Sequence, residues 1–484
     1  MAEIKCDLAV IGTGAAGLVA GTVAGGLGFK VCTVEKDRIG GECTWTGCVP
    51  SKALLHSAQV AWRLQHGPWG GVKANAGAID ISGAMEFARE KSRAISAEAT
   101  PEKLRKQRGF EVLMGEPQLE PDGIVRVGDD TLIARQTILT TGSHPFVPPI
   151  DGLDEVEFLT NENLWELETI PDSLLIIGAG PIGMEMGQAF NRLGTEVTVF
   201  ERGEQVLHRD DHELANRLRD MLIEEGVNIL CHAEATKVAS ENGQRVVTAQ
   251  VDGEEQVFTA DELLVAVGRR ANVENLGLDE VGVAYTERGV QVDRHLRTTN
   301  PRIWAAGDVL GTWQFSHLAE AEATTAVRNA LFPLADEMDY SAAGWATFTD
   351  PELASCGINE HEAEEQGIRH CVYRFGFDED DRSRVDQEDR GEIKVIADPR
   401  SKRIHGAQIL GPHAGELIQE FIVAMAHGVP ISELARTVHV YPTYSMATQR
   451  ASQMYWDEFG RRDSIQKYLG WYTSLTGWEG AEDR

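Results

Sequence analysis

The sequence CDLAVIGTGAAG, residues 6–17, decides the fold of the first part of the chain. Its apolar run predicts a strand, and Gly12, Gly14 and Gly17 follow directly, before a stretch that predicts a helix. The next predicted strand ends in Glu35, about twenty residues further on. Glycines in such a turn let backbone amides approach a pyrophosphate, and the acid would bind an adenosine ribose. The stretch therefore predicts a Rossmann-like dinucleotide site.

The same unit occurs a second time in SLLIIGAGPIGMEMGQAFNRLGTEVTVFER, residues 173–202. Here Gly178, Gly180 and Gly183 follow the predicted strand, and the next strand ends in Glu201. Two units predict two dinucleotides, and the alternative is one functional site with a decayed duplicate. A carboxylate at Glu201 suits the free ribose hydroxyl of NADH and would repel the extra phosphate of NADPH. The neighbouring Arg202 leaves NADPH as the alternative.

Composition limits the class of protein and its partners. The 484 residues suffice for about three domains, and 42% hydrophobic with 25% charged residues is typical of a globular protein. The formal net charge of −31 would repel nucleic acid and anionic membrane surfaces, so we expect no nucleic-acid partner and no membrane insertion. The first residues show no secretory signal pattern, and seven cysteines do not form a disulfide framework. We therefore expect a cytoplasmic protein.

Two cysteines lie close together in GGECTWTGCVPSK, residues 40–52. In a cytosolic protein a close pair is usually metal-binding or catalytic. Cys43 and Cys48 make a poor zinc site, because no second close pair supplies the remaining ligands, and we expect no metal. The other cysteines are scattered through predicted strands and loops and are expected to be small buried hydrophobic residues: Cys6, Cys32, Cys231, Cys356 and Cys371.

Taken together, the motifs resemble the class I flavoprotein disulfide reductases, which include dihydrolipoamide dehydrogenase, glutathione reductase and mercuric reductase. The resemblance runs from the first strand to about residue 460. The redox motif matches in both cysteines, their spacing, and Pro50, Ser51 and Lys52. Three further stretches match: TTGSHPFVP (140–148), IWAAGDV (303–309) and GEIKVIADPRSKRIHGAQILGPHAGELI (391–418).

This resemblance implies an α/β fold with two Rossmann-like domains and a C-terminal α+β dimerisation domain. FAD would bind to residues 1–148 and 270–340, and NAD(P) to residues 149–269. Residues 341–460 would form the dimerisation domain of a homodimer whose active site lies at the subunit interface. Residues 461–484 would be an aromatic-rich C-terminal extension.

The resemblance also assigns roles to single residues. Cys48 would lie against the flavin as the charge-transfer thiolate, and Cys43 would meet the substrate. Lys52 would pair with Glu185 beside the nicotinamide, and Gly142 and Asp308 would contact FAD. Two electrons would pass from NADH through FAD to the cysteine pair, and then to an acceptor by exchange that requires a thiolate. A helix predicted to begin near Pro50 would help to stabilise that thiolate.

The sequence departs from the family in HVYPTYSMA, residues 439–447. Tyr441 stands where the family has its catalytic histidine, and Met446 stands where it has the orienting glutamate. His439 lies two residues before Tyr441, which on an extended segment is a distance of about 6.5–7 Å. It is therefore beyond hydrogen-bond reach of the position of the family's histidine. Tyrosine, with a pKa of about 10, is a poor base at neutral pH. We therefore expect slow lipoamide and glutathione turnover, and leave open whether Tyr441 or His439 moves protons.

The mercuric-reductase-like and dihydrolipoamide-dehydrogenase-like branch resembles this chain most, although no cysteine follows Cys371 to form a C-terminal pair. The expected acceptor is a disulfide, a persulfide or another thiol-reactive compound. One alternative is direct transfer from flavin to a quinone or oxygen. Another is a slow redox-sensing flavoprotein that acts through a partner.

Two further stretches carry weaker expectations. Arg382 and Arg384 lie in the charged stretch 373–391, which predicts a solvated loop, with an anion site as the alternative. The aromatic residues near the C-terminus, Trp456, Trp471 and Trp478, are expected to pack on the body of the protein, with an exposed partner-binding patch as the alternative.

Overall fold

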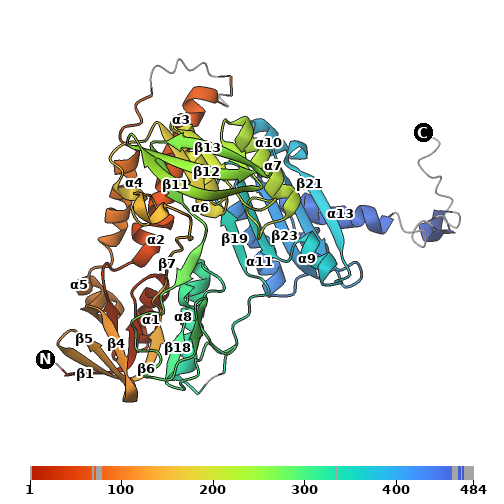
Figure 1. Cartoon of the computed structure of the whole chain (residues 1–484). Helices are drawn as coiled ribbons and strands as arrows, with labels where there is room; N and C mark the ends of the chain where they lie inside the picture. The colour runs from red at the N-terminus through yellow and green to blue at the C-terminus, as the bar shows by residue number, and fades with distance from the viewer. Residues whose placement is uncertain are drawn as a thin grey trace. The chain divides into compact units, whose positions relative to one another are not determined.

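The computed structural model describes residues 3–67, 70–71, 79–333, 335–460, 467–469 and 471–473 (Figure 1). The chain forms two compact units. The first contains most of the chain up to residue 339, and the second contains residues 207–221 together with the chain from residue 340 onward.

The first unit begins with a mainly parallel sheet around the N-terminal strand. Its parallel strands run in the order β3-β2-β1-β6, with β18 beside β6: β1 (Glu3–Ile11), β2 (Val31–Glu35), β3 (Phe110–Met114), β6 (Asp130–Leu139) and β18 (Ile303–Ala305). Two antiparallel strands, β4 (Pro117–Glu120) and β5 (Ile124–Val127), extend the sheet from β6. This is the open sheet that the first glycine motif predicts.

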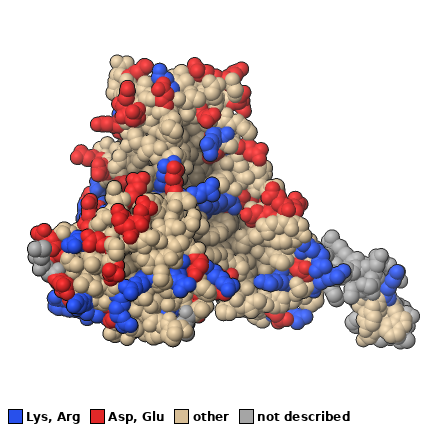
Figure 2. Space-filling view, turned by 60° about the horizontal axis from the view of Figure 1, so that its bottom comes forward, with Lys and Arg blue, Asp and Glu red and all other residues tan. Residues whose placement is uncertain are grey.

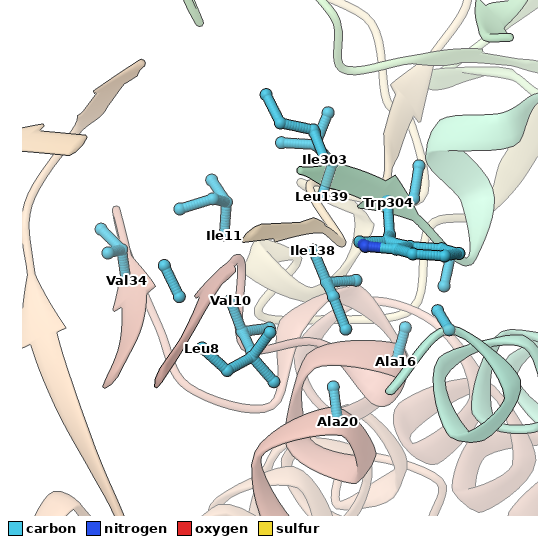
Figure 3. Packing of buried hydrophobic residues seen from close by; sticks show 14 of the residues in the cluster. Leu8, Val10, Ile11, Ala16, Ala20, Val34, Ile138, Leu139, Ile303 and Trp304 are labelled. Carbon is cyan, nitrogen blue, oxygen red and sulfur yellow. The ribbon is translucent and has the colours of Figure 1, made fainter. Parts of the chain in front are cut away.

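The core of this sheet is built from apolar strand residues and small helical residues. Leu8, Val10 and Ile138 are completely buried, as expected for a parallel sheet that is covered on both faces. They belong to one cluster with Ala16 and Ala20 of α1 (Ala15–Gly26), as Figure 3 shows. Because alanine has a short side chain, α1 can pack close to the strands and place its N-terminus at the end of β1.

The second glycine motif builds another parallel sheet with the same strand order. The order is β10-β9-β8-β14, formed by β8 (Ser173–Ile177), β9 (Glu196–Phe200), β10 (Asn228–Leu230) and β14 (Glu262–Val265). The helix after β8 is α6 (Pro181–Arg192). An antiparallel sheet follows, made of β11 (Ala233–Glu241), β12 (Gln244–Val251) and β13 (Glu254–Ala260). The prediction of two Rossmann-like folds is confirmed.

A small antiparallel pair forms where the chain passes from one parallel sheet to the other and back. β7 (Ser143–Pro145) pairs with β15 (Arg269–Ala271), with Ser143 opposite Ala271 and Pro145 opposite Arg269. The other described elements of this unit are α2 (Gly41–Trp45), α3 (Cys48–His66), α4 (Ala84–Ser96), α5 (Pro101–Lys103), β16 (Tyr285–Thr286), β17 (Gly289–Val290) and α8 (Ser316–Leu331).

The second unit is an antiparallel sheet covered by helices. Its order is β19-β20-β23-β22-β21: β19 (Gly344–Thr347), β20 (Glu352–Gly357), β21 (Cys371–Gly376), β22 (Glu392–Ala397) and β23 (Ile404–Gly411). The helices are α9 (Glu360–Glu365), α10 (Asp381–Asp386), α11 (Ala414–Ala426), α12 (Ile431–Leu434) and α13 (Ser445–Gly460). Apolar residues of α11 and α13 share one core cluster with the sheet, so the predicted α+β domain is confirmed.

Residues 207–221, which include most of α7 (His212–Glu224), are held in this second unit by buried polar contacts. The Nζ atom of Lys394, 1% exposed, lies 2.7 Å from the carboxylate of Asp211. The neighbouring Asp210 accepts hydrogen bonds from Trp345 Nε1 at 2.9 Å and Ser355 Oγ at 2.6 Å. Burial raises the pKa of Asp210 to about 6, although both hydrogen bonds lower it.

Several minor expectations need correction. Cys6, Cys32 and Cys356 are buried, but Cys231 and Cys371 are only partly buried. The stretch 373–391 is not a loop, because it contains the end of β21 and the helix α10. Within α10, Arg382 pairs with Asp386 at 2.5 Å, whereas Arg384 is exposed.

The aromatic residues near the C-terminus also differ from expectation. Trp471 is 60% exposed, so the prediction that it packs on the body is wrong. Trp456 is 40% exposed and packs only in part, against Tyr455 and Arg436. Instead, Trp471 and Tyr472 lie beside Tyr468, with centroid distances of 5.9 Å and 6.4 Å. Trp478 lies outside the described residues.

The surface carries charges of both signs. Figure 2 shows acidic and basic side chains interspersed over one face. None of the helices in the described part of the chain has the length and apolar composition needed to cross a lipid bilayer.

Candidate active site

The first glycine turn joins β1 to α1. Gly12 has φ +106°, and a Cβ atom there would collide with the carbonyl oxygen of Thr140, so only glycine fits. Glu35, at the end of β2, accepts backbone hydrogen bonds from Thr13 at 2.9 Å and Asp37 at 3.0 Å. The acid and the turn are therefore fixed to each other before any ligand binds.

The second glycine turn repeats this geometry between β8 and α6. Gly178 has φ +104°, and a Cβ atom there would meet the carbonyl oxygen of Ala266 at 2.5 Å. Glu201 accepts backbone hydrogen bonds from Ala179 at 3.2 Å and Gly203 at 2.8 Å. Arg202, the residue that kept NADPH as an alternative to NADH, has an exposed side chain.

Both turns fit the pyrophosphate of a dinucleotide. A Cβ atom on Gly180 would meet nothing within 4 Å, and one on Gly14 would meet only the Cα atom of Gly41, at 3.9 Å. The backbone at these two positions therefore faces open space at a helix N-terminus, where anions bind. Gly17 and Gly183 have the opposite role, since a Cβ atom on either would collide with the carbonyl oxygen of the first glycine of its own turn.

The redox motif forms two helices separated by two residues, and its Gly41 lies against the first glycine turn. Cys43 lies on α2, and Cys48 is the first residue of α3. The helix therefore begins two residues before the predicted position at Pro50, and its N-terminus is at the sulfur-bearing residue itself. Gly41 has φ +58°, and a Cβ atom there would lie 2.7 Å from the Cα atom of Gly14. Both cysteines are free thiols in this structure.

The two thiols differ in their acidity. A hydrogen bond with Cys43, helped by the Ser316 hydroxyl and the Lys52 charge, lowers the pKa of Cys48 to about 6, although burial opposes it. The Ser316 Oγ atom lies 3.7 Å from the Cys48 sulfur. The hydrogen bond with Cys48, together with burial, raises the pKa of Cys43. These contacts therefore favour the negative charge on Cys48 and the proton on Cys43.

Lys52 and Glu185 form the ion pair that the motifs predict. The Lys52 Nζ atom lies 2.7 Å from Glu185 Oε2, and their side chains are 36% and 6% exposed. The pair joins α3, which carries Cys48, to α6, which follows the second glycine turn. A positive charge is thereby fixed on the helix that starts at the thiolate.

Asp308 lies in a polar environment at the end of β18. It accepts a hydrogen bond from Ser143 Oγ at 2.6 Å, and Ser143 in turn accepts one from Arg269 Nε at 2.9 Å. Gly142, with φ +71°, directly precedes Ser143. These contacts place both predicted FAD contacts, Gly142 and Asp308, beside the β7–β15 pair.

An acidic residue of the redox motif, Glu42, belongs to the same polar environment. It contacts the guanidinium of Arg269 and accepts a hydrogen bond from Asn161 Nδ2 at 2.7 Å. Burial, together with the charges of Asp308 and Cys48, raises the pKa of Glu42 to about 7 although Arg269 lowers it. The sequence signal was an acid next to Cys43, but nothing in the spacing indicated Arg269 or Asn161.

Tyr441 and His439, the two candidates for proton transfer, lie in the second unit. Tyr441 is 67% exposed, and its hydroxyl donates a hydrogen bond to Asp381 at 3.2 Å. The negative charge of Asp381 raises the pKa of Tyr441. The phenol therefore keeps its proton at neutral pH and can donate it in a hydrogen bond.

His439 is already engaged within its own chain. Its Nε2 atom lies 2.8 Å from Glu420 Oε1, and its Nδ1 atom lies 3.0 Å from the carbonyl oxygen of Thr437. Each ring nitrogen therefore faces an oxygen acceptor of its own chain. Glu420 also accepts a hydrogen bond from the Thr448 hydroxyl. No sequence pattern pointed to Glu420, which lies on α11, 19 positions before His439.

The described ranges contain no group of three or more His, Cys, Asp or Glu side chains that could hold a metal ion.

Comparisons with known proteins cover nearly the whole chain. The family model of the pyridine nucleotide-disulphide oxidoreductases matches residues 6–323, and that of their dimerisation domain matches residues 344–452. A mercuric reductase from Streptomyces lividans is 35% identical over 462 residues, covering 93% of this chain and 96% of the relative. A dihydrolipoyl dehydrogenase from Staphylococcus aureus is 32% identical over 455 residues, covering 93% and 96%.

Among solved structures, the Cu(II) complex of the HOCl-induced flavoprotein disulfide reductase RclA from Escherichia coli matches with a TM-score of 0.84. The identity is 26%, and the match covers 93% of this chain and 99% of that chain.

Proposed function

The chain belongs to the pyridine nucleotide-disulphide oxidoreductases, and from this premise we propose that it transfers two electrons from NADH to a thiol-reactive acceptor through the Cys43–Cys48 pair. The acceptor is a disulfide, a persulfide or another compound that reacts with a thiol. The enzyme acts as a homodimer with its active site at the subunit interface, which the match to the family's dimerisation domain supports.

The observation that carries the proposal is the setting of the cysteine pair: Cys48 begins α3, Ser316 Oγ lies 3.7 Å from its sulfur, and the ion-paired Lys52 lies one turn into the same helix. A thiolate at Cys48, at the N-terminus of α3 and near Lys52, supports a charge-transfer role. The proton on Cys43 keeps that sulfur in the thiol form until an acceptor arrives. For a disulfide acceptor, Cys43 loses this proton, its sulfur attacks one acceptor sulfur, and the other acceptor sulfur leaves as a thiolate. The Cys48 thiolate then attacks the Cys43 sulfur, which releases the second acceptor thiolate and restores the Cys43–Cys48 disulfide.

FAD supplies the two-electron chemistry of this family, and the residues of this chain hold and orient it. The first glycine turn would bind its pyrophosphate, Glu35 its ribose, and Asp308 its ribityl region. The second glycine turn would bind the nicotinamide dinucleotide. Glu201, fixed by two backbone amides, supports NADH over NADPH because its carboxylate would repel a ribose phosphate.

The acceptor is one that tolerates the missing histidine–glutamate dyad. Tyr441 retains its proton, and His439 is engaged by Glu420 and Thr437, so neither offers a free base. A positioned acid–base contributes about 10²–10⁴-fold to rate, so lipoamide and glutathione disulfide should be poor substrates. The names of the relatives widen the choice of acceptors to test, since one acts on mercuric ion and another forms a Cu(II) complex.

The test is an acceptor screen on the wild-type enzyme and the Cys43→Ser variant with each nicotinamide. The screen covers lipoamide, glutathione disulfide, polysulfide, Hg(II), Cu(II) and quinones. We expect one thiol-reactive acceptor to be reduced rapidly by the wild type and at least about 100-fold more slowly by Cys43→Ser, because the sulfur relay is lost. Equal rates in both proteins would replace this proposal with direct transfer from the flavin. Negligible turnover with every acceptor would favour a sensor that acts through a partner.

A further inference from the structure

A closed ring of polar contacts holds the helix that carries Cys43. The carboxylate of Glu42 contacts the guanidinium of Arg269, Arg269 donates to Asn161 Oδ1 at 3.3 Å, and Asn161 donates back to Glu42 at 2.7 Å. We call these three residues the α2 clamp. Arg269 is 11% and Glu42 29% exposed, and Asn161 is buried, so the contacts are only partly open to water.

The clamp fastens α2 to the β7–β15 pair. Glu42 directly precedes Cys43 on α2, and Arg269 is the first residue of β15. Arg269 also donates to Ser143, the first residue of β7, at 2.9 Å. A second contact holds the C-terminal end of α2, where Thr46 is the C-cap residue. Trp165 Nε1 donates to the carbonyl oxygens of Thr46 and Asn161, each at 2.9 Å.

Helix α2 is too short to fix its own direction. It has five residues, none of them buried, and its N-cap makes no side-chain hydrogen bond. A helix this short is unstable in isolation, because the first turn costs more conformational entropy than one hydrogen bond returns. Contacts from outside the helix must therefore fix the direction of the Cys43 side chain.

We propose that Glu42 and Arg269 are positioning residues for the cysteine pair: through the α2 clamp they fix the Cys43 sulfur relative to Cys48 on α3. This inference rests on the proposed function, in which Cys43 delivers electrons to the acceptor. The charge of Glu42 also acts on Cys43 and raises the pKa of that thiol.

The test compares Glu42→Gln, Arg269→Gln and the matched control Glu162→Gln. Glu162 is an exposed acid next to Asn161, so its variant removes a nearby charge and leaves the α2 clamp intact. We expect the first two variants to reduce the disulfide-type acceptor about 10- to 100-fold more slowly, because small displacements of a reacting group cost this much. Reduction of ferricyanide, which takes electrons from flavin directly, should change less than about two-fold in Glu42→Gln and Glu162→Gln, whereas Arg269→Gln also removes the hydrogen bond to Ser143 beside Asp308.

A second measurement does not depend on turnover. Reduced and oxidised dithiothreitol is equilibrated with the holoenzyme, and the fraction of Cys43–Cys48 disulfide is measured by alkylation and mass spectrometry. The measured quantity is the ratio of reduced to oxidised dithiothreitol at which half of the protein carries the disulfide. Because α2 is loosened, this ratio should change by about ten-fold in Glu42→Gln and Arg269→Gln, and Glu162→Gln should keep the wild-type ratio. The double variant should shift it no further than the larger single variant, because the two residues act as one unit.

The outcomes separate this inference from the proposed function. Unchanged acceptor rates and an unchanged disulfide ratio in both clamp variants would overturn the inference, as would an equal effect of Glu162→Gln. A parallel loss of ferricyanide reduction in Glu42→Gln would also overturn it, since the role would then be general stability. If Glu42→Gln does not fold, Glu42→Asp keeps the charge, withdraws the carboxylate, and should give the same two shifts. Full acceptor reduction by Cys43→Ser would instead refute the proposed function.

Discussion

Replacing Ser316 by alanine should raise the pH at which Cys48 becomes a thiolate by about one unit. The Ser316 hydroxyl lies 3.7 Å from the Cys48 sulfur and lowers the pKa of that thiol. Hydrogen bonds to charged groups contribute about 1.5–3 kcal/mol, and a long contact to sulfur belongs at the lower end. A loss of about 1.4 kcal/mol corresponds to one pH unit.

The sign follows from the charge on sulfur. Ser316 donates to the thiolate and stabilises the ionised form, so its removal favours the protonated thiol. The pKa of Cys48, which is lowered in the wild type, must therefore move upward and not downward. At a pH near the wild-type midpoint, less of the reduced enzyme would carry the charge-transfer thiolate.

The assay follows the long-wavelength charge-transfer absorbance of the two-electron-reduced enzyme as a function of pH. Ser57→Ala is the matched control, because Ser57 lies on α3, the helix that begins at Cys48. Its hydroxyl donates to the carbonyl oxygen of Ala53 at 3.2 Å. Its midpoint should equal that of the wild type. A shift below about 0.3 units in Ser316→Ala, or an equal shift in Ser57→Ala, would refute the assignment of Ser316 to the sulfur.

Three further predictions concern other parts of the chain. Glu201→Ala should raise kcat/KM for NADPH relative to NADH at least about ten-fold in steady-state assays, because the repelling carboxylate is gone; an unchanged ratio would contradict that role. Asp210 has its pKa raised from 3.8 to about 6, so the wild type loses stability as pH rises from about 4 to about 6. Asp210→Asn should remove this loss and be more stable in urea unfolding at pH 8 by about 1–3 kcal/mol, and equal or lower stability there would count against it. His439→Gln should lower acceptor turnover less than about three-fold with an unchanged pH profile, whereas a catalytic base would cost about 10²–10⁴-fold.

The parts of the site that sequence could predict are those encoded by local patterns. Each glycine turn is specified within about thirty residues, because a strand, a backbone conformation reserved for glycine and an acid follow in a fixed order. The Lys52–Glu185 pair followed from two motifs that the family places together, and the ion pair is present at 2.7 Å. The roles of these residues in turnover stay predictions.

The residues that sequence could not predict come from distant segments. Arg269 is 227 positions from Glu42, and Ser316 is 268 positions from Cys48. A single arginine or serine at such a distance carries no pattern, since only the packing of β15 and α8 brings it to the redox motif. Glu420 lies only 19 positions before His439, but it too belongs to no motif, and its contact with His439 depends on the packing of α11.

The contact between Gly41 and Gly14 has a consequence for how this enzyme can evolve. A single added methyl group at position 41 would lie 2.7 Å from the Cα atom at position 14. A substitution at Gly41 in the redox motif would therefore also displace the first glycine turn, which would bind the cofactor. Laboratory selection for a new oxidising substrate should spare both glycines and gather its changes elsewhere.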